Sequence, residues 1–365
     1  MKNPADLRAD PHGRAPPCSI GKSTSAGRLG RIANHLVYKI RIVYRKRTPN
    51  YFDAREMDPR VTLAGPKLGF HYMFHPKSVY AHLETDDQGF SVICVNGQWR
   101  RQPLTHCHMT MRKFYEYLQT GDAASRQRFL DAVELLRGAV RTVQIGGATC
   151  DVLYYDFEMA LCAPHPVPWI CCMSQAWAMS LFCRAYQASG REDYLAAARR
   201  LMAVFTVPVA QGGLLDHDSQ GHVYYEEYPF PGQTVHVLNG FMSSLMGLYD
   251  LYRATGDAEA KRLFDQGIAT LAADGVLERY DIGYCSVYDQ ACVRKALPAY
   301  PRYNLVHVRQ LTVLHRITGI ELFREIAERW YAYSRSPWCR FRCLLDSVAY
   351  RLRNLPRYIR DAVQA

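Results

Sequence analysis

Four segments of the chain repeat one pattern of apolar and polar positions. In each, an apolar stretch rich in aromatic residues ends in Thr-Gly or Ser-Gly, and a second amphipathic stretch follows. The glycines are Gly121, Gly190, Gly256 and Gly319, which are 69, 66 and 63 residues apart. Glycine readily adopts the left-handed conformation that ends a helix. The repeat therefore predicts a series of helical hairpins.

The stretches after these glycines, such as 194–205 and 322–330, carry apolar residues three and four positions apart. This spacing places them on one face of an α-helix. Consecutive helical hairpins that bury a shared core curl into a solenoid or close into a ring. The predicted fold class is all-α, an (α/α) toroid or incomplete barrel of helical hairpins over residues 106–334, with a central cleft.

Residues 51–105 follow a different pattern. Short β-prone runs such as 90–94 are interrupted by turn residues, among them Asn96-Gly97, which is typical of β-hairpins. We expect a small β-containing segment at 51–105, ahead of the helices. Residues 1–50 are expected to form a basic, partly disordered segment, and residues 335–365 a basic amphipathic tail.

The net charge of +11 is concentrated at the two ends. Residues 1–47 carry +9 and residues 335–365 carry +5, so the stretch between them carries −3. Basic ends can contact anionic polysaccharide, anionic lipid or nucleic acid, or remain solvated. For the C-terminal tail two readings stay open. Its apolar stripe either lies in a membrane interface or packs on the helices. The residues concerned are Leu344, Leu345, Val348 and Leu352, with Arg342, Arg351 and Arg353 at the margins.

Twelve cysteines lie mostly in apolar contexts. Their spacing is not that of a disulfide scaffold, so we expect reduced, buried thiols. The N-terminus lacks the apolar core of a signal peptide, and no apolar run reaches 18 residues. The expected location is cytoplasmic, with peripheral contact to an anionic membrane surface at its inner face.

Three short motifs resemble ligand sites but lack the partners that such sites need. Ile20-Gly-Lys-Ser-Thr has no earlier glycine at the spacing of a phosphate-binding loop. His106/His108 and Cys339/Cys343 are isolated pairs without further ligands at metal spacing. We therefore expect no metal site and no cofactor.

Two connections between the predicted helices are dense in titratable and aromatic residues. The first holds Tyr-Glu-Glu-Tyr-Pro at 225–229 and then Asn239. The adjacent Glu226 and Glu227 point to different sides of an extended segment, so one of them can face a cleft. Asn239 is read equally as a helix cap or as a substrate contact. The second connection runs over 279–311 and contains several tyrosines and His307.

These connections resemble the C-terminal part of the glucuronyl C5-epimerase family. The similarity extends from about residue 165 to 334, and a weaker similarity reaches back to about residue 50. The shared motifs are Tyr-Glu-Glu-Tyr-Pro at 225–229, Val-Leu-Asn-Gly-Phe at 237–241, Gly-Leu-Tyr-Asp-Leu at 247–251, Tyr-Asp-Ile-Gly at 280–283, Tyr288-Asp289, and Tyr303-Asn-Leu-Val-His307-Val-Arg-Gln310-Leu.

The resemblance implies an isomerase that converts D-glucuronate to L-iduronate within a heparosan-like, glycosaminoglycan-like or capsular polysaccharide. It places the family's catalytic tyrosines on Tyr228, Tyr288 and Tyr303. Epimerisation removes the C5 proton and returns one to the other face, which needs two opposed acid/base groups. We assign these to Tyr228 and Tyr303. Candidates for substrate orientation are Glu227, Asn239, His307, Arg302 or Arg309, Arg294 and Gln175.

Two other functions stay open. A polysaccharide lyase would begin with the same C5 proton abstraction. A non-catalytic saccharide-binding or assembly protein is suggested by Ala291, Asn304 and Trp177, where the family carries Arg, His and Gln. The expected partners are an acidic polysaccharide and a membrane surface, with no nucleic acid. The oligomeric state is open, with a homodimer as one alternative.

Overall fold

The computed structural model describes residues 84–95, 97–158, 165–291, 301–346 and 348–350. The basic segment predicted at 1–50 lies outside these residues, and so does Arg294.

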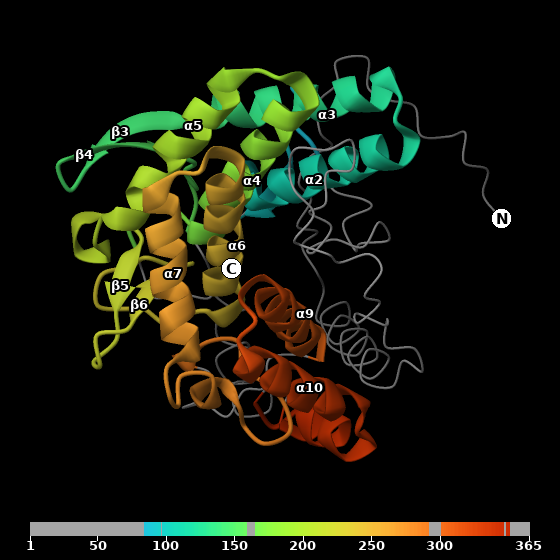
Figure 1. The fold of residues 1–365 in the computed structure, drawn as a ribbon, viewed down its shortest axis with the longest axis vertical. Coiled ribbons are helices and arrows are strands. Elements are labelled where there is room, and N and C mark those ends of the chain that lie inside the picture. Colours follow the sequence, from blue (N-terminus) through green and yellow to red (C-terminus); the bar gives the residue numbers. More distant parts are fainter. Residues whose placement is uncertain (1–83, 96, 159–164, 292–300, 347, 351–365) are drawn as a thin grey trace.

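Four antiparallel helical hairpins form the body of the protein (Figure 1). Their first helices, α2, α4, α6 and α9, contact one another in succession and form the inner layer, and the second helices pack outside them. The hairpins follow an arc in the described part of the chain, which confirms the predicted all-α class and the incomplete (α/α) toroid. The pairs are α2 (Pro103–Thr120) with α3 (Ala123–Ala139), α4 (Cys172–Ser189) with α5 (Glu192–Met202), α6 (Leu238–Thr255) with α7 (Ala258–Ala272), and α9 (Pro301–Thr318) with α10 (Glu321–Arg335).

The repeated glycines end the inner helices, as the pattern predicts. Gly121, Gly190, Gly256 and Gly319 all adopt positive φ, between 68° and 74°. Each donates its N–H to the carbonyl four residues earlier, the first of these bonds joining Gly121 to Tyr117. Each closes a helix of 18 residues. The sequence period covers one helical hairpin together with the connection to the next.

Three β-hairpins accompany these helices in the described residues. The first, β1 (Val92–Val95) with β2 (Gln98–Arg101), precedes the helices. The other two, β3 (Arg141–Ile145) with β4 (Ala148–Val152) and β5 (Leu215–His217) with β6 (Val223–Tyr225), lie within the range predicted to be wholly helical. That expectation was wrong for these connections. The missed signal was Gly146-Gly147, both at positive φ, between two β-prone runs. Short 3₁₀ turns lie at η3 (Ala203–Thr206), η4 (Val209–Gln211) and η5 (Glu278–Tyr280).

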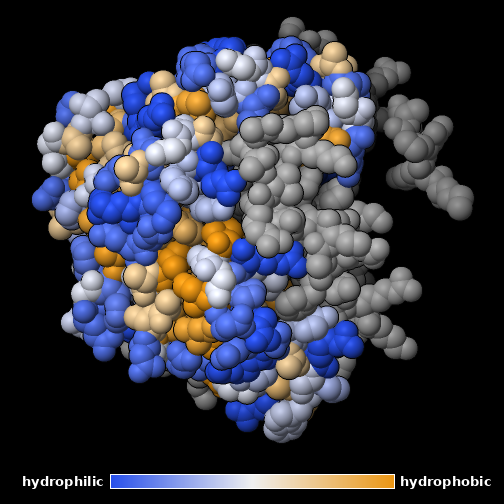
Figure 2. All heavy atoms as spheres, in the orientation of Figure 1, coloured by the Kyte–Doolittle hydropathy of each residue, from blue (hydrophilic) through white to orange (hydrophobic). Residues whose placement is uncertain are grey.

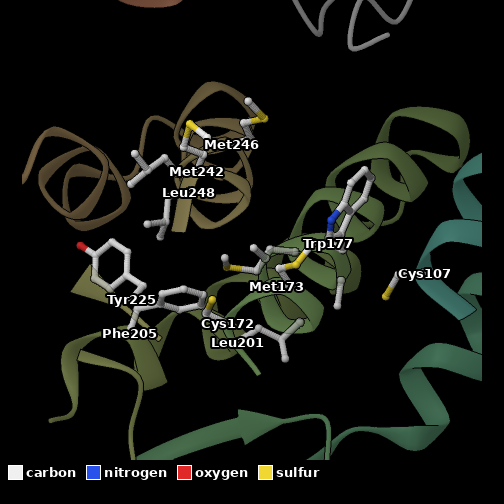
Figure 3. Close-up of a cluster of buried hydrophobic side chains, with 14 of the residues drawn as sticks. Cys107, Cys172, Met173, Trp177, Leu201, Phe205, Tyr225, Met242, Met246 and Leu248 are labelled. Atoms are coloured by element: carbon white, nitrogen blue, oxygen red, sulfur yellow. The ribbon is translucent and has the colours of Figure 1, made fainter. Parts of the chain in front are cut away.

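The core lies between the layers and is centred on α4, which buries nearly its whole length (Figure 3). Trp177 and Met173 of α4 lie between Cys107 of α2 and Met246 of α6. The sulfur-containing side chains fill irregular gaps between the helices. Eight described cysteines have free thiols and seven of these are buried, as expected. Cys94 departs from the expectation because it is disulfide-bonded.

Close approach of α4 and α6 depends on Gly247. A Cβ at this position would lie 2.5 Å from the carbonyl oxygen of Ala176, a backbone atom that cannot turn away. We expect Gly247→Ala to lower the free energy of unfolding by about 2–3 kcal/mol. Gly138 of α3 has no neighbour within 4 Å of such a Cβ. The control Gly138→Ala should stabilise by about 0.5–1 kcal/mol through helix propensity. The free energy of unfolding of both variants is measured by urea denaturation. Equal effects of the two substitutions would contradict the packing argument.

The C-terminal residues 337–346 are helical. Trp338, Phe341 and Leu345 are exposed, whereas Cys343 is buried and contacts the carbonyl of Tyr284. Among the described residues, the exposed apolar face thus shares Leu345 with the predicted stripe but also contains Trp338 and Phe341, and Leu352 of that stripe lies outside the described residues.

The face shown in Figure 2 is mostly polar over the outer helices, with apolar side chains gathered over α6 between α7 and α9. Among the described residues, none of the helices has the length and hydrophobicity that crossing a membrane requires.

Candidate active site

Glu227 and Tyr228 directly follow β6 and meet a tyrosine from the loop before α9. The hydroxyl of Tyr288 donates to Oε1 of Glu227 over 2.9 Å. The hydroxyls of Tyr228 and Tyr288 lie 3.5 Å apart. These contacts link residues about 60 positions apart in the sequence, from two different inter-helix connections. They form a continuous chain of three groups that can exchange protons.

Glu227 is held at the N-terminal end of α6. A side chain at Gly240, in the first turn of that helix, would collide with the Glu227 carboxylate. Glu227 is buried, and its Oε2 has no hydrogen-bond partner. Burial raises the pKa of Glu227 to about 7, and the hydrogen bond from Tyr288 partly opposes this rise. A buried carboxyl with such a pKa can accept or release a proton near neutral pH.

The third tyrosine, Tyr303, lies in the first turn of α9. Its ring meets that of Tyr288 edge to face, with centroids 4.9 Å apart, and 38% of the residue is exposed. Burial, reinforced by the charge of Glu227, raises the pKa of Tyr228 and Tyr288 well above 10. Both phenols are therefore protonated at neutral pH. The structure brings together all three tyrosines that the sequence motifs selected.

The loop that carries Tyr288 is anchored to α9 by buried hydrogen bonds. Oδ1 of Asn304 accepts from the backbone N–H of Ser286, and its Nδ2 donates to the carbonyl of Trp330. The Ser286 hydroxyl lies 2.8 Å from Nδ1 of His307. His307 is fully buried, and burial lowers its pKa to about 3. His307 was expected to contact substrate, but it supports the loop as a neutral imidazole.

Asn239 is not the cap of α6, because Val237 occupies that position. Its Nδ2 contacts the sulfur of Met173 in α4, and its carbonyl accepts from Gln310 in α9. Its Oδ1 is buried without a hydrogen-bond partner. Of the two readings of Asn239, only the substrate contact remains as a prediction.

Gln175 was expected to orient substrate. It is fully buried in α4, and both ends of its amide bond to the backbone of Leu153. It fastens the chain after β4 to α4, so the structure gives it a structural position instead. The side chain of Arg302 and the whole of Arg294 lie outside the described residues, and Arg309 is half-buried in α9.

Two further residues lie around the site: Trp169, which the sequence did not indicate, and Glu226, the neighbour of Glu227. The ring of Trp169 packs against the rings of Tyr228 and Phe230, with centroids 6.0 Å and 5.6 Å apart. These contacts hold the ring of Tyr228 in place at the site. On the other side of the chain, Glu226 is completely buried. Burial, and secondly the charge of Asp216, raise the pKa of Glu226 to about 8, although the backbone N–H groups of Val235 and His236 lower it. Trp169 lies in none of the motifs selected from the sequence, so nothing distinguished it from a core residue.

Parts of this sequence are similar to known proteins. A family model described as the D-glucuronyl C5-epimerase C-terminus matches residues 148–332. The D-glucuronyl C5-epimerase of Caenorhabditis elegans is 32% identical over 187 residues, which are 46% of this chain and 29% of the nematode protein. An uncharacterized protein of Methanocaldococcus jannaschii is 30% identical over 230 residues, which are 60% of this chain and 72% of that protein. The chain thus spans less than a third of the nematode enzyme.

Solved structures give weaker similarity. Cellobiose 2-epimerase from Bacillus thermoamylovorans aligns with a TM-score of 0.46 at 13% identity, over 72% of this chain and 66% of that chain. A family 76 glycoside hydrolase from a bovine Bacteroides thetaiotaomicron strain aligns with a TM-score of 0.45 at 14% identity, over 67% and 50%. Because the family model covers about half of the chain and includes Glu227 and the three tyrosines, the protein belongs to the D-glucuronyl C5-epimerase C-terminus family.

Proposed function

We propose that this protein inverts C5 of uronic acid residues within an acidic polysaccharide, converting D-glucuronate to L-iduronate. The observation that carries the proposal is the chain of contacts from Tyr228 through Tyr288 to Glu227. Removal of a proton next to a carboxylate needs a base that is shielded from water and can pass the proton on. A half-buried tyrosine bonded through a second tyrosine to a buried carboxylate supplies both properties.

In one direction, the oxygen of Tyr228 takes the C5 proton while its own proton moves to Tyr288. Tyr288 in turn gives its proton to Glu227, which becomes a carboxylic acid. The electron pair of the broken C–H bond enters the C5–C6 bond, and the substrate carboxylate becomes an enediolate. Burial raises the pKa of Glu227 to about 7. The Glu227 carboxylate is therefore a stronger base than an exposed carboxylate, which favours transfer of the proton from Tyr288.

On the opposite face of the sugar, Tyr303 donates its phenolic proton to C5 and completes the inversion. Because it is partly exposed, Tyr303 regains a proton from water, and Glu227 gives up its proton to water through Tyr288 and Tyr228 once the product has left. The negative charge of the enediolate is stabilised by the N-terminal end of α6, which lies next to Glu227, since helix N-termini favour anions. The arginines named as candidates for substrate orientation remain predictions.

The decisive experiment incubates the protein with an unsulfated glucuronate polymer of the heparosan type in heavy water. We expect deuterium at C5 and the appearance of iduronate, both read by NMR. An unsaturated-uronate chromophore would instead indicate a lyase. Saturable binding without C5 exchange would indicate a saccharide-binding protein, the reading suggested by Ala291, Asn304 and Trp177. Asn304 accepts a hydrogen bond from the Ser286 N–H in the Tyr288 loop and donates one to the Trp330 carbonyl in α10. Because it holds this loop in place, its difference from the family residue is compatible with an active site.

We also propose that the C-terminal helix contacts an anionic membrane surface. Trp338, Phe341 and Leu345 are three of the five large apolar side chains exposed in the described residues, and Arg342 is exposed beside them. Aromatic residues flanked by arginine suit a lipid interface, where each base contributes about 1 kcal/mol.

The substitution Trp338→Ala together with Phe341→Ala should therefore weaken binding to anionic vesicles in a flotation assay, and raised salt should weaken binding of the unaltered protein. Val167→Ala, which removes an equally exposed apolar side chain in another segment, is the control and should bind normally. Binding that ignores both salt and the double substitution would show that the helix has no such role.

A further inference from the structure

Asp216, Glu226 and His236 converge from three segments behind the tyrosine site. Asp216 lies in β5, Glu226 follows β6, and His236 lies in the loop before α6. Nε2 of His236 is 3.0 Å from Oδ2 of Asp216 and 3.5 Å from Oε1 of Glu226. One potential ligand atom from each residue lies within 4.8 Å of the other two, a spacing found for no other such group in the described part of the chain.

Glu226 gives an independent sign that this cluster binds something. The residue is completely buried, and neither carboxylate oxygen accepts a hydrogen bond of normal geometry, although the backbone N–H groups of Val235 and His236 lie close enough to lower its pKa. A buried polar group without partners costs free energy, and the cost is larger for a carboxylate. Its two oxygens lie beside a histidine and a second carboxylate, so a cation at this place would supply the missing partner.

A proton on His236 satisfies this need only in part. One Nε2–H can donate to Asp216 or to Glu226, but it leaves the other carboxylate without a donor. The neighbouring Arg279 is engaged elsewhere, since it binds Asp218 at 2.9 Å. A divalent cation between the three residues contacts both carboxylates and the imidazole at once.

The backbone already holds His236 in a position to bind a metal. Its φ is 50°, and it is the one described non-glycine residue with positive φ, a conformation that is strained and often linked to function. Its ring stacks on Tyr224 with centroids 4.0 Å apart and planes 10° apart. Its carbonyl accepts a hydrogen bond from the hydroxyl of Tyr280 over 2.7 Å. Together these contacts direct Nε2 toward the two carboxylates.

We propose that Asp216, Glu226 and His236 form a binding site for a divalent transition-metal ion, for which Zn²⁺ fits best. Tetrahedral Zn²⁺ with bonds of about 2.0–2.1 Å sets its ligand atoms about 3.3 Å apart, close to the two distances measured from His236. One nitrogen and two carboxylate oxygens suit Zn²⁺ or Mn²⁺, whereas Ca²⁺ and Mg²⁺ prefer six or more oxygen ligands. The partly exposed Asp216 side chain leaves access for a water as fourth ligand.

The ion positions the active site and takes no part in proton transfer. It ties the hairpin that leads into Glu227 and Tyr228 to the loop before α6. That loop also holds the segment of Tyr288, because Leu238 donates to the carbonyl of Tyr288 and Gln290 donates to that of Val235. The metal thus fixes the two halves of the tyrosine relay relative to each other.

The test measures metal binding by the full chain, after removal of metal with a chelator. We expect one equivalent of Zn²⁺ by elemental analysis and calorimetry, an increase in melting temperature with added Zn²⁺, and a visible spectrum of four-coordinate Co²⁺ when cobalt replaces it. His236→Asn should abolish all three signals. If that variant fails to fold, Asp216→Asn, at a partly exposed position, tests the same prediction.

The matched control is His222→Ala. His222 pairs with Asp218 at 2.9 Å in the turn of the same β5–β6 hairpin, but a third acidic or thiol ligand does not join them among the described residues. This variant should retain one equivalent of Zn²⁺. Absence of tight binding by the unaltered chain, or equal binding by the His236→Asn and Asp216→Asn variants, would overturn the proposal. Neither outcome depends on epimerase activity, so the two proposals fail separately.

Discussion

Replacement of Glu227 by Gln is expected to lower kcat by about 10²–10⁴-fold with no loss of stability. The amide has nearly the same shape and can still accept the hydrogen bond of Tyr288, but it cannot take up a proton from it. Burial of Glu227 penalises its charged form, so a neutral amide should leave the melting temperature unchanged or raise it. Proton transfer through Tyr228 and Tyr288 would then have no final acceptor. The loss is measured as the rate of C5 deuterium exchange.

Tyr228→Phe should give a loss of the same order, because the relay loses the oxygen that meets C5. The matched control is Tyr225→Phe, three residues earlier, where the hydroxyl donates to the carbonyl of Leu263 in the core. That change should cost about 1 kcal/mol of stability and leave kcat intact. If Tyr225→Phe reduces exchange as strongly as Tyr228→Phe, the assignment of Tyr228 to the chemistry fails.

The repeat of glycines in the sequence predicted the helices well because each helix end depends on local backbone geometry. A residue at positive φ with its N–H bonded four residues back is a local requirement that glycine meets wherever it stands. The β3–β4 and β5–β6 hairpins were missed because their strands are only three to five residues long. Such runs give little periodic signal against long helices.

The site was predictable in its members but not in its connections. The motifs selected Tyr228, Tyr288 and Tyr303, which the structure places together, although no sequence pattern indicates that Tyr288 bonds to Glu227. His307 and Gln175 were assigned to substrate because polar residues in shared motifs suggest contact. Both are fully buried and bond to the protein itself. Burial is a tertiary property, so a motif alone cannot separate a substrate ligand from a support for the loop.

One long-range contact can be traced to the repeat itself. Arg184 and Asp250 each stand six residues before the glycine that ends their helix, α4 or α6. Neighbouring inner helices therefore present equivalent positions to each other, and Arg184 meets Asp250 at 2.7 Å with both side chains at most 2% exposed. The hydroxyl of Ser180 also donates to this carboxylate. The pair is thus the electrostatic contact that joins two successive hairpins at the centre of the core.

Removal of one member of this pair should give the largest loss of stability of any substitution considered. Asp250→Ala leaves the charge of Arg184 in the core without its carboxylate partner, and the expected loss is about 3–5 kcal/mol of unfolding free energy. Asp265→Ala is the control, since Asp265 forms an exposed ion pair with Lys261, worth about 0–1 kcal/mol. Denaturant unfolding of both variants measures the difference.

The double substitution Arg184→Met with Asp250→Leu separates the two physical reasons for such a loss. If the cost arises from an uncompensated buried charge, replacing both members with apolar residues should recover most of the stability. If instead the ion pair itself supplies the stability, the double variant should remain as unstable as Asp250→Ala. Gly240 and its contact with Glu227 lie at the N-terminal end of α6, away from Asp250. The double variant should therefore retain C5 exchange if its stability is recovered. Restored folding without exchange would show that the charged pair also sets the position of α6 at the site.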